Sequence, residues 1–327
     1  MTTKRHDVII VGSGVAGLAA ADTLTALGMG VLLVDDNARP GGQLLRRPPL
    51  GAGRAKRFEP DRLKHWGFRR VAALETGRVT LLQNAQVLGL YPEHTLLVEG
   101  PPGRVAEYRA RTIVLATGAR ERQVPFPGWT LPGVISTGGA QILMKSAGVL
   151  PGERPLIAGC GPLLPALAAE ILANGGRVAG ILDGTSMLYK LKTFGEIGAY
   201  GAVPTLGSKI LEGALCLARL VAGRVPVMQG TRVIEARGGQ CLEAVVAARV
   251  GPRGRILPGS ETRYATDTLA VGHGFVPNIE LPRQAGCRVA YHVDRGGWHV
   301  AVSPAMETSL TGVYAVGETT GTVSYTH

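Results

Sequence analysis

Short apolar runs, glycine-rich turns and alanine-rich stretches alternate along this chain. The first set of these segments predicts a strand over residues 7–11, a helix over 15–27 and a second strand over 31–35. The same order returns later, with a strand from Leu156, a helix over 163–174 and a strand that ends at Asp183. A strand, a helix and a parallel strand in succession make a β-α-β unit, so we expect two such units.

Other segments fill the chain between and after these units. We expect helices near 60–75 and 208–222, and a hairpin-like stretch over 85–109. Further strands are expected at 79–82, 112–115, 231–236, 243–250, 268–272 and 313–316. The predicted fold class is α/β, with two Rossmann-like dinucleotide-binding domains, the second inserted into the first. The expected boundaries are 1–122 with 274–327 for the first domain and 123–273 for the second.

Composition supports an α/β chain of this kind and narrows its partners. The 327 residues are 45% hydrophobic and include 47 glycines. The net charge of +11 comes without a nucleic-acid recognition motif, so we expect it to attract nucleotides or an acidic partner face. No apolar run approaches the ~18 residues of a membrane span, and we expect a cytoplasmic protein. The four cysteines show no C-x-x-C spacing, which speaks against a local redox dithiol.

The first glycine-rich loop carries the strongest chemical signal. Gly12, Gly14 and Gly17 follow a strand and open a helix, the arrangement that brings backbone N–H groups and a helix N-terminus to a pyrophosphate. Asp35 ends the next strand, where a carboxylate can accept hydrogen bonds from ribose, and Asp36 could share or take over that role. The loop residues Val15 and Ala16 belong to the same predicted cofactor site.

The second loop is weaker. Gly159, Gly161, Pro162 and Leu163 follow a strand, but a leucine stands where the third glycine belongs. Asp183 at the end of the following strand suits a free ribose and disfavours a 2′-phosphate. Three outcomes stay open for this site: turnover of NAD(H), static binding of another adenine nucleotide, or no ligand.

Further small-residue segments complete the pattern. Two of them, Gly41-Gly42-Gln43 and Ala116-Thr117-Gly118, each follow the end of a strand, and Gly317-Glu318 follows the final one. In this order the motifs resemble those of the FAD/NAD(P)-linked disulfide-oxidoreductase superfamily. The resemblance implies FAD as cofactor, bound by all of these segments and the first loop, with Val87 as a further contact. Glu318 replaces the usual Asp.

Two longer segments carry a narrower resemblance, Ala119–Val134 and His273–Asn278. Both resemble the large flavin subunits of heteromeric amino-acid and amine dehydrogenases, a group that includes dye-linked L-proline dehydrogenase, octopine and nopaline oxidase, D-hydroxyproline dehydrogenase and hydrogen cyanide synthase. The resemblance implies an electron-transferring subunit, with an amino-acid or imino-acid substrate oxidised on a partner β subunit that carries its own flavin. A small iron–sulfur protein is a further implied partner.

Several features leave alternatives open. The helix that follows the terminal glycine-acid pair in this superfamily is absent from the 327 residues. The residues themselves identify no catalytic acid or base, and His292 and His299 lack metal-ligand spacing, so we expect no metal. Nine Lys and Arg residues between Arg46 and Arg70 form either a solvated face or a docking surface. A stand-alone NAD(P)H-dependent reductase and a non-catalytic nucleotide-binding scaffold are the competing functions.

Overall fold

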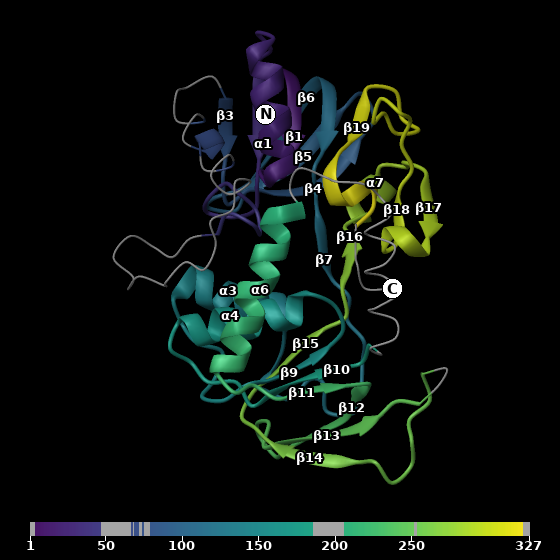
Figure 1. The fold of residues 1–327 in the computed structure, drawn as a ribbon. Coiled ribbons are helices and arrows are strands. Elements are labelled where there is room, and N and C mark those ends of the chain that lie inside the picture. Colours follow the sequence, from purple (N-terminus) through teal and green to yellow (C-terminus); the bar gives the residue numbers. More distant parts are fainter. Residues whose placement is uncertain are drawn as a thin grey trace.

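A mixed sheet and a parallel sheet, joined by a short two-stranded ribbon, organise the chain (Figure 1). The computed structural model describes residues 4–46, 67, 69–71, 74, 79–185, 206–251 and 254–322. Of the expected helix near 60–75, residues 67, 69–71 and 74 are described and helical, and the rest lies outside the described residues, as does most of the basic segment between Arg46 and Arg70. No helix among the described residues is long and apolar enough to cross a membrane.

The first sheet has the strand order β3-β2-β1-β6-β5-β4, and β19 pairs with β6. Its strands are β1 (Lys4–Val11), β2 (Val31–Val34), β3 (Val79–Leu82), β4 (Gln86–Tyr91), β5 (Thr95–Gly100), β6 (Arg104–Leu115) and β19 (Val313–Ala315). Strands β3, β2, β1, β6 and β19 run parallel, whereas β4 and β5 join antiparallel. The helix α1 (Val15–Ala26) crosses from β1 to β2.

Strand β1 is buried on both faces. Ile9 and Ile10, which point to opposite sides of the sheet, are both 0% exposed. Ile10 packs with Leu18 of α1, whereas Ile9 packs with Ile113 on the other face. Burial on two faces explains why this strand is a continuous apolar run rather than an alternating one.

Strand β6 is longer than the sequence predicts. The hairpin-like stretch expected over 85–109 forms β4, β5 and the start of β6, and its last residues merge with the separate strand expected at 112–115 into one strand of 12 residues, Arg104–Leu115. Its first half pairs antiparallel with β5, and its second half pairs parallel with β1 and β19. No glycine or proline interrupts this stretch, so the ladder continues from the meander into the parallel sheet.

The second sheet is wholly parallel, in the order β11-β10-β9-β15-β8. Its strands are β8 (Val134–Ser136), β9 (Leu156–Gly159), β10 (Gly180–Asp183), β11 (Val227–Gln229) and β15 (Leu269–Gly272). The helices of this unit are α3 (Thr137–Ile142), its π-helical extension Leu143–Ala147, α4 (Leu163–Ala173) and α6 (Leu206–Ala222). An antiparallel meander follows, β12 (Thr231–Arg237), β13 (Ala244–Arg249) and β14 (Thr262–Ala265).

The chain passes between the two sheets twice, through strands that pair with each other. Strand β7 (Ala119–Glu121) leads to the second sheet, and β16 (Phe275–Pro277) leads back, antiparallel to it. The returning chain forms α7 (Glu280–Gln284), the hairpin of β17 (Val289–His292) and β18 (Gly297–Val300) with its 3-10 turn Val293–Arg295, and finally β19 and the 3-10 turn η4 (Gly317–Thr320). This arrangement confirms the predicted fold class of two Rossmann-like units, one inserted into the other. The residue boundaries of the domains stay a prediction.

Candidate dinucleotide sites

The first glycine loop is shaped by two close backbone approaches. Gly12 has φ 100°, and a Cβ built there would lie 2.3 Å from the carbonyl oxygen of Ala116. A Cβ on Gly17 would lie 1.9 Å from the carbonyl oxygen of Gly12. Gly14 differs, because a Cβ there would meet no atom within 4 Å. Gly12 and Gly17 therefore pack α1 against the strand ends, and Gly14 leaves open space before the helix N-terminus, where an anion can bind.

Asp35 is turned inward onto this loop. Its Oδ2 accepts hydrogen bonds from the Ser13 backbone N–H (2.5 Å) and the Ser13 hydroxyl (2.6 Å). Its Oδ1 accepts from the backbone N–H (2.8 Å) and the side-chain amide (2.9 Å) of Asn37. The residue is 6% exposed. Asp36, by contrast, is exposed, and its Oδ1 accepts a hydrogen bond from Asn37 Nδ2 at 2.6 Å. The hydrogen bonds of Asp35 thus stabilise the loop, whereas the carboxylate of Asp36 is exposed to solvent.

The Gly41-Gly42-Gln43 turn lies directly against the first loop. The N–H of Gly41 donates to the carbonyl oxygen of Ser13 at 2.9 Å. Gly42 has φ 58°, and a Cβ there would lie 2.8 Å from the Cα of Gly14. Gln43 accepts a hydrogen bond from Arg46 Nε at 3.0 Å. Glycine is needed at position 42 because any side chain there would collide with the phosphate-binding loop.

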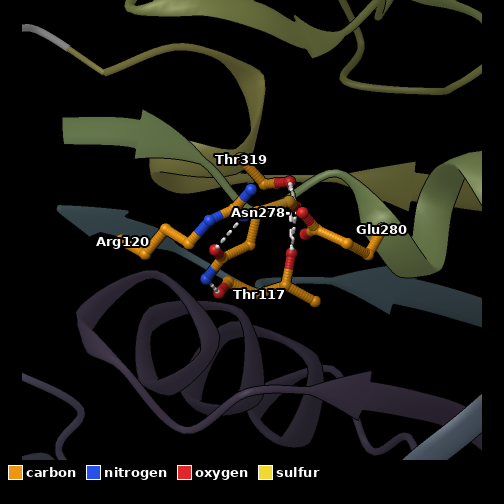
Figure 2. A network of polar contacts seen from close by, with 5 residues as sticks. All are labelled: Thr117, Arg120, Asn278, Glu280 and Thr319. Carbon is orange, nitrogen blue, oxygen red and sulfur yellow. Dashed lines mark hydrogen bonds and ion pairs between the residues drawn. The ribbon is translucent and has the colours of Figure 1, made fainter. Parts of the chain in front are cut away.

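Asn278 joins the ends of strands that are far apart in sequence (Figure 2). Its side-chain amide donates to the carbonyl oxygen of Thr117 at 2.9 Å. Its own carbonyl oxygen accepts from the hydroxyls of Thr117 and Thr319, both at 2.9 Å. Its Oδ1 accepts from Arg120, which also forms an ion pair with Glu280 at 2.7 Å. The sequence motifs do not predict Asn278 or Thr319 as site residues. The only signal was the position of Asn278 at the end of the distinctive His273–Asn278 segment.

The terminal turn η4 closes the same region. A Cβ on Gly317 would lie 2.7 Å from the Cβ of Ala16, so η4 packs against the start of α1. Glu318 is exposed at the surface, yet surrounding atoms withdraw enough water from its carboxyl group to raise its pKa above the ordinary value.

Val87 lies on β4, two residues beyond Ala85, whose N–H donates to the carbonyl oxygen of Asp35 at 3.0 Å. The described contacts therefore bring the loop at Gly12–Gly17, the turn at 41–43, the end of β6 and η4 together, and they leave Val87 at the edge of the group.

The second loop has the same outline with a different helix start. Gly159 has φ 132°, and a Cβ there would lie 1.8 Å from the carbonyl oxygen of Gly272. Gly161 also has positive φ, at 98°. Pro162 precedes α4, which begins four residues after Gly159, whereas α1 begins three residues after Gly12. Leu164, at the place of the third glycine, is 0% exposed and packs in the core of this unit.

Strand register equates Asp183 with Asp35. Asp183 pairs with Gly159, the first glycine of its loop. In the first unit Val11 pairs with Val34, so the next residues in register are Gly12 and Asp35. Asp183 is 4% exposed and accepts the N–H of Thr185 at 2.9 Å. The position that corresponds to the exposed Asp36 is therefore Gly184, which has no side chain.

Charged and polar groups surround the mouth of the second loop. Two effects raise the pKa of the Cys160 thiol: burial, which is the larger, and the negative charge of Asp183. The pKa of His273 is lowered mainly by burial and, to a smaller extent, by the positive charges of Arg232 and Arg122. The positive charges of both arginines also lower the pKa of Cys160, against the larger effect of burial. The four cysteines are free, and no group of three or more His, Cys, Asp or Glu side chains within the described ranges could hold a metal ion.

The fold and the first site define a class of protein, the flavoproteins built from two dinucleotide-binding units. A family model described as pyridine nucleotide-disulphide oxidoreductase matches residues 6–162. The chain resembles this family over these residues, and the relatives that it matches along most of its length include subunits of hydrogen cyanide synthase and opine oxidase.

Individual relatives agree with this placement. The hydrogen cyanide synthase subunit HcnB of Pseudomonas aeruginosa is 34% identical, over 96% of this chain and 66% of that protein. An opine oxidase subunit of Agrobacterium tumefaciens is 31% identical, over 97% of this chain and 61% of that protein. The structure of L-proline dehydrogenase from P. horikoshii superimposes with a TM-score of 0.64 at 18% identity, over 98% of this chain and 52% of that one, a likeness of fold. The chain thus spans less than two thirds of the length of each of these three proteins.

Proposed function

We propose that this chain is the FAD-binding, electron-transferring subunit of a heteromeric amino-acid or amine dehydrogenase. One observation carries the proposal: four segments from distant parts of the chain meet around the open space at Gly14. The similarity to HcnB and to the opine oxidase protein, each a subunit of its enzyme, supports the role within a complex.

The residues of the first site fit a dinucleotide. Gly14 and Gly118 face open space, since a Cβ on either would meet no atom within 4 Å. The N-terminus of α1 points its free N–H groups to the same side as Gly14. We assign the pyrophosphate of FAD to the loop at Gly12–Gly17, with Val15 and Ala16 in the first helical turn. Gly41, Gly42, Gln43, Thr117 and Gly118 would line the cofactor, and Gly317 and Glu318 would contact its ribityl side.

The ribose contact is assigned to Asp36 rather than to Asp35. Asp35 already accepts four hydrogen bonds from Ser13 and Asn37 and is nearly buried. A carboxylate in this state has few lone pairs left for a ligand. Asp36 is exposed beside it and keeps acceptor capacity. Asp35 is a positioning residue for the loop, and Val87 stays a peripheral candidate.

When bound, FAD would accept two electrons, and the residues of this chain would bind and orient it. The Asn278 network keeps the end of β6 and η4 at a fixed separation, because one residue bonds to Thr117 and Thr319. No side chain is assigned a proton-transfer role. The substrate class that we propose is amino acids or imino acids, oxidised at a partner β flavoprotein subunit. A small iron–sulfur protein is a further proposed partner, and the cytoplasm the proposed location.

The second loop is proposed as a weaker nucleotide site. Leu164 fills the place of the third glycine, and Gly184 supplies no ribose acceptor. These features favour static binding of an adenine nucleotide, or none, over turnover of NAD(H). They therefore favour the subunit role over a stand-alone NAD(P)H-dependent reductase.

Anaerobic reduction of the flavin tests the proposal. The complex is purified from its native host through a tag on this chain, and its visible spectrum is followed after addition of NADH, proline, hydroxyproline, glycine or an opine. We expect one of the amino or imino acids to bleach the flavin within turnover time and NADH to leave it oxidised. Rapid bleaching by NADH alone overturns the proposal. Absence of flavin from the purified complex would instead support a non-catalytic scaffold.

A further inference from the structure

A cavity that is separate from both glycine loops lies beside the ribbon of β7 and β16. Its volume is about 670 Å³, within the range of roughly 300–1,000 Å³ that is typical of small-molecule sites. The walls come from the ribbon, from α7 and from the β17–β18 hairpin. None of these wall residues belongs to the proposed FAD contacts.

The cavity carries a net positive charge. Arg120, Arg122 and Arg283 line it with a single carboxylate, Glu280, which gives a net charge of +2. Arg120 is paired with Glu280 at 2.7 Å, and Arg122 donates to the carbonyl oxygen of Gly296 at 3.0 Å. The guanidinium of Arg283 is exposed and has no hydrogen-bond or ion-pair partner in the described part of the chain. One complete guanidinium fork is therefore available to an oxyanion.

One wall of the cavity is aromatic. Tyr291 and Trp298 face each other across the hairpin, with ring centroids 5.5 Å apart and an interplanar angle of 68°. They are 59% and 54% exposed, although each contributes a large apolar surface. Rings that are fixed edge to face and left half open can take a further planar group by stacking. A guanidinium next to an aromatic face also binds planar anions well, because both contacts are flat.

We propose that this cavity is a binding site for a planar anion, an aromatic ring that bears a phosphate or carboxylate group. The oxyanion binds Arg283, and Arg122 supplies a second positive charge in the lining. The ring lies against Tyr291 and Trp298. The assignment does not depend on the cofactor in the first site, because no wall residue is shared with it.

Calorimetric titration of the full-length chain with phenyl phosphate tests the site. Phenol and inorganic phosphate, which each carry half of the proposed recognition features, are titrated in parallel. We expect phenyl phosphate to bind at least ~10-fold more tightly than either, since the charge-assisted hydrogen bonds and the stacking contact act together. Equal affinity for phenyl phosphate and inorganic phosphate would overturn the planar part of the proposal, and no binding would overturn all of it.

Variants locate the binding. Arg283→Gln should weaken the binding of phenyl phosphate about 10-fold. Arg283→Lys should restore part of this affinity, because lysine supplies the positive charge but not the two parallel N–H donors of a guanidinium. Arg249→Gln is the matched control, since Arg249 is exposed on β13 and does not line the cavity. Trp298→Leu should weaken the binding of phenyl phosphate and leave the affinity for inorganic phosphate unchanged. The same affinity in Arg283→Gln as in the wild type, with an unchanged melting temperature, places the ligand elsewhere and overturns the proposal.

Discussion

Ser13 and Asp35 form a two-point contact in which one carboxylate oxygen accepts both the backbone N–H and the hydroxyl of the serine, at 2.5 and 2.6 Å. The contact joins the first glycine loop to the end of the neighbouring strand. The acidic residue at this strand end therefore has a structural task, whereas its neighbour Asp36 is exposed.

Substitution of the two aspartates should separate these roles. Asp35→Ala leaves the Ser13 N–H and hydroxyl without an acceptor in a buried setting, and we expect unfolding of the apoprotein to become easier by about 2 kcal/mol. Asp36→Ala should leave the free energy of unfolding within ~0.5 kcal/mol of the wild type and weaken FAD binding about tenfold. Denaturant unfolding and FAD titration measure the two quantities. An Asp36→Ala protein with wild-type FAD affinity contradicts the ribose assignment.

Replacement of Gly42 should abolish cofactor binding for a steric reason. In Gly42→Ala the new Cβ lies 2.8 Å from the Cα of Gly14, in addition to the cost of ~1–2 kcal/mol for φ 58°. Gly28→Ala is the control, with φ 81° but no atom within 4 Å of its Cβ. We expect Gly28→Ala to retain FAD after gel filtration and Gly42→Ala to lose it. Equal retention by both would mean that the turn does not press on the loop.

The second loop should gain affinity from one added carboxylate. Gly184 occupies the position that matches Asp36, and its Cβ direction meets the carbonyl oxygen of Gly159 at 3.3 Å, a contact that small shifts relieve. Gly184→Asp should tighten NADH about tenfold, measured by nicotinamide fluorescence, because it supplies the missing ribose acceptor. Gly184→Asn serves as the uncharged control and should give a smaller gain. Strong NADH binding by the wild type would refute the weaker-site assignment.

Asn278 should affect the cofactor through one of its two amide atoms. Asn278→Asp keeps the acceptor for Arg120 but loses the donor to the Thr117 carbonyl oxygen. We expect this variant and Asn278→Ala to weaken FAD binding by a similar factor of ~5–10 and to shift the visible flavin spectrum. Arg120→Gln removes the contact to Asn278 Oδ1 and the ion pair with Glu280 but keeps the amide hydrogen bond to Thr117, so it should leave both readouts near the wild type. A loss of melting temperature without any change in FAD affinity or spectrum would reduce Asn278 to a purely structural role.

Glu318 makes the stability of the apoprotein depend on pH in a defined direction. Its carboxyl pKa is raised in the folded state by burial, so the folded protein holds this proton more tightly than the unfolded chain. Stability then falls as pH rises from the ordinary Glu value of 4.5 through the raised folded value. Glu318→Gln should therefore melt higher than the wild type at pH 7, and the difference should shrink toward pH 4. A constant difference across this range would show that burial of the charge is not its cause.

The sequence predicts the parts of the fold that follow from local periodicity. The strands around Ile9 and Ile157 are apolar without interruption, and the helices beginning at Val15 and Leu163 follow glycine turns, so their types are confirmed, with bounds that differ by at most a few residues. Strand β6 is the exception, because a hairpin partner and a sheet partner use successive halves of one strand.

Long-range contacts decide what these patterns leave open. Only the tertiary structure turns Asp35 inward to Ser13 and leaves Asp36 outside, since both residues are carboxylates at the same strand end. It also pairs β7 with β16 and brings Asn278 to Thr117, 161 residues away.

The sequence by itself therefore determined that the chain has two dinucleotide-binding units of unequal quality, because glycine spacing and apolar runs are local properties. The tertiary structure decided which acidic side chain is buried and which is exposed, what joins the segments of the first site, and where a cationic, aromatic cavity opens. These depend on the directions of side chains from distant strands, which no local pattern encodes.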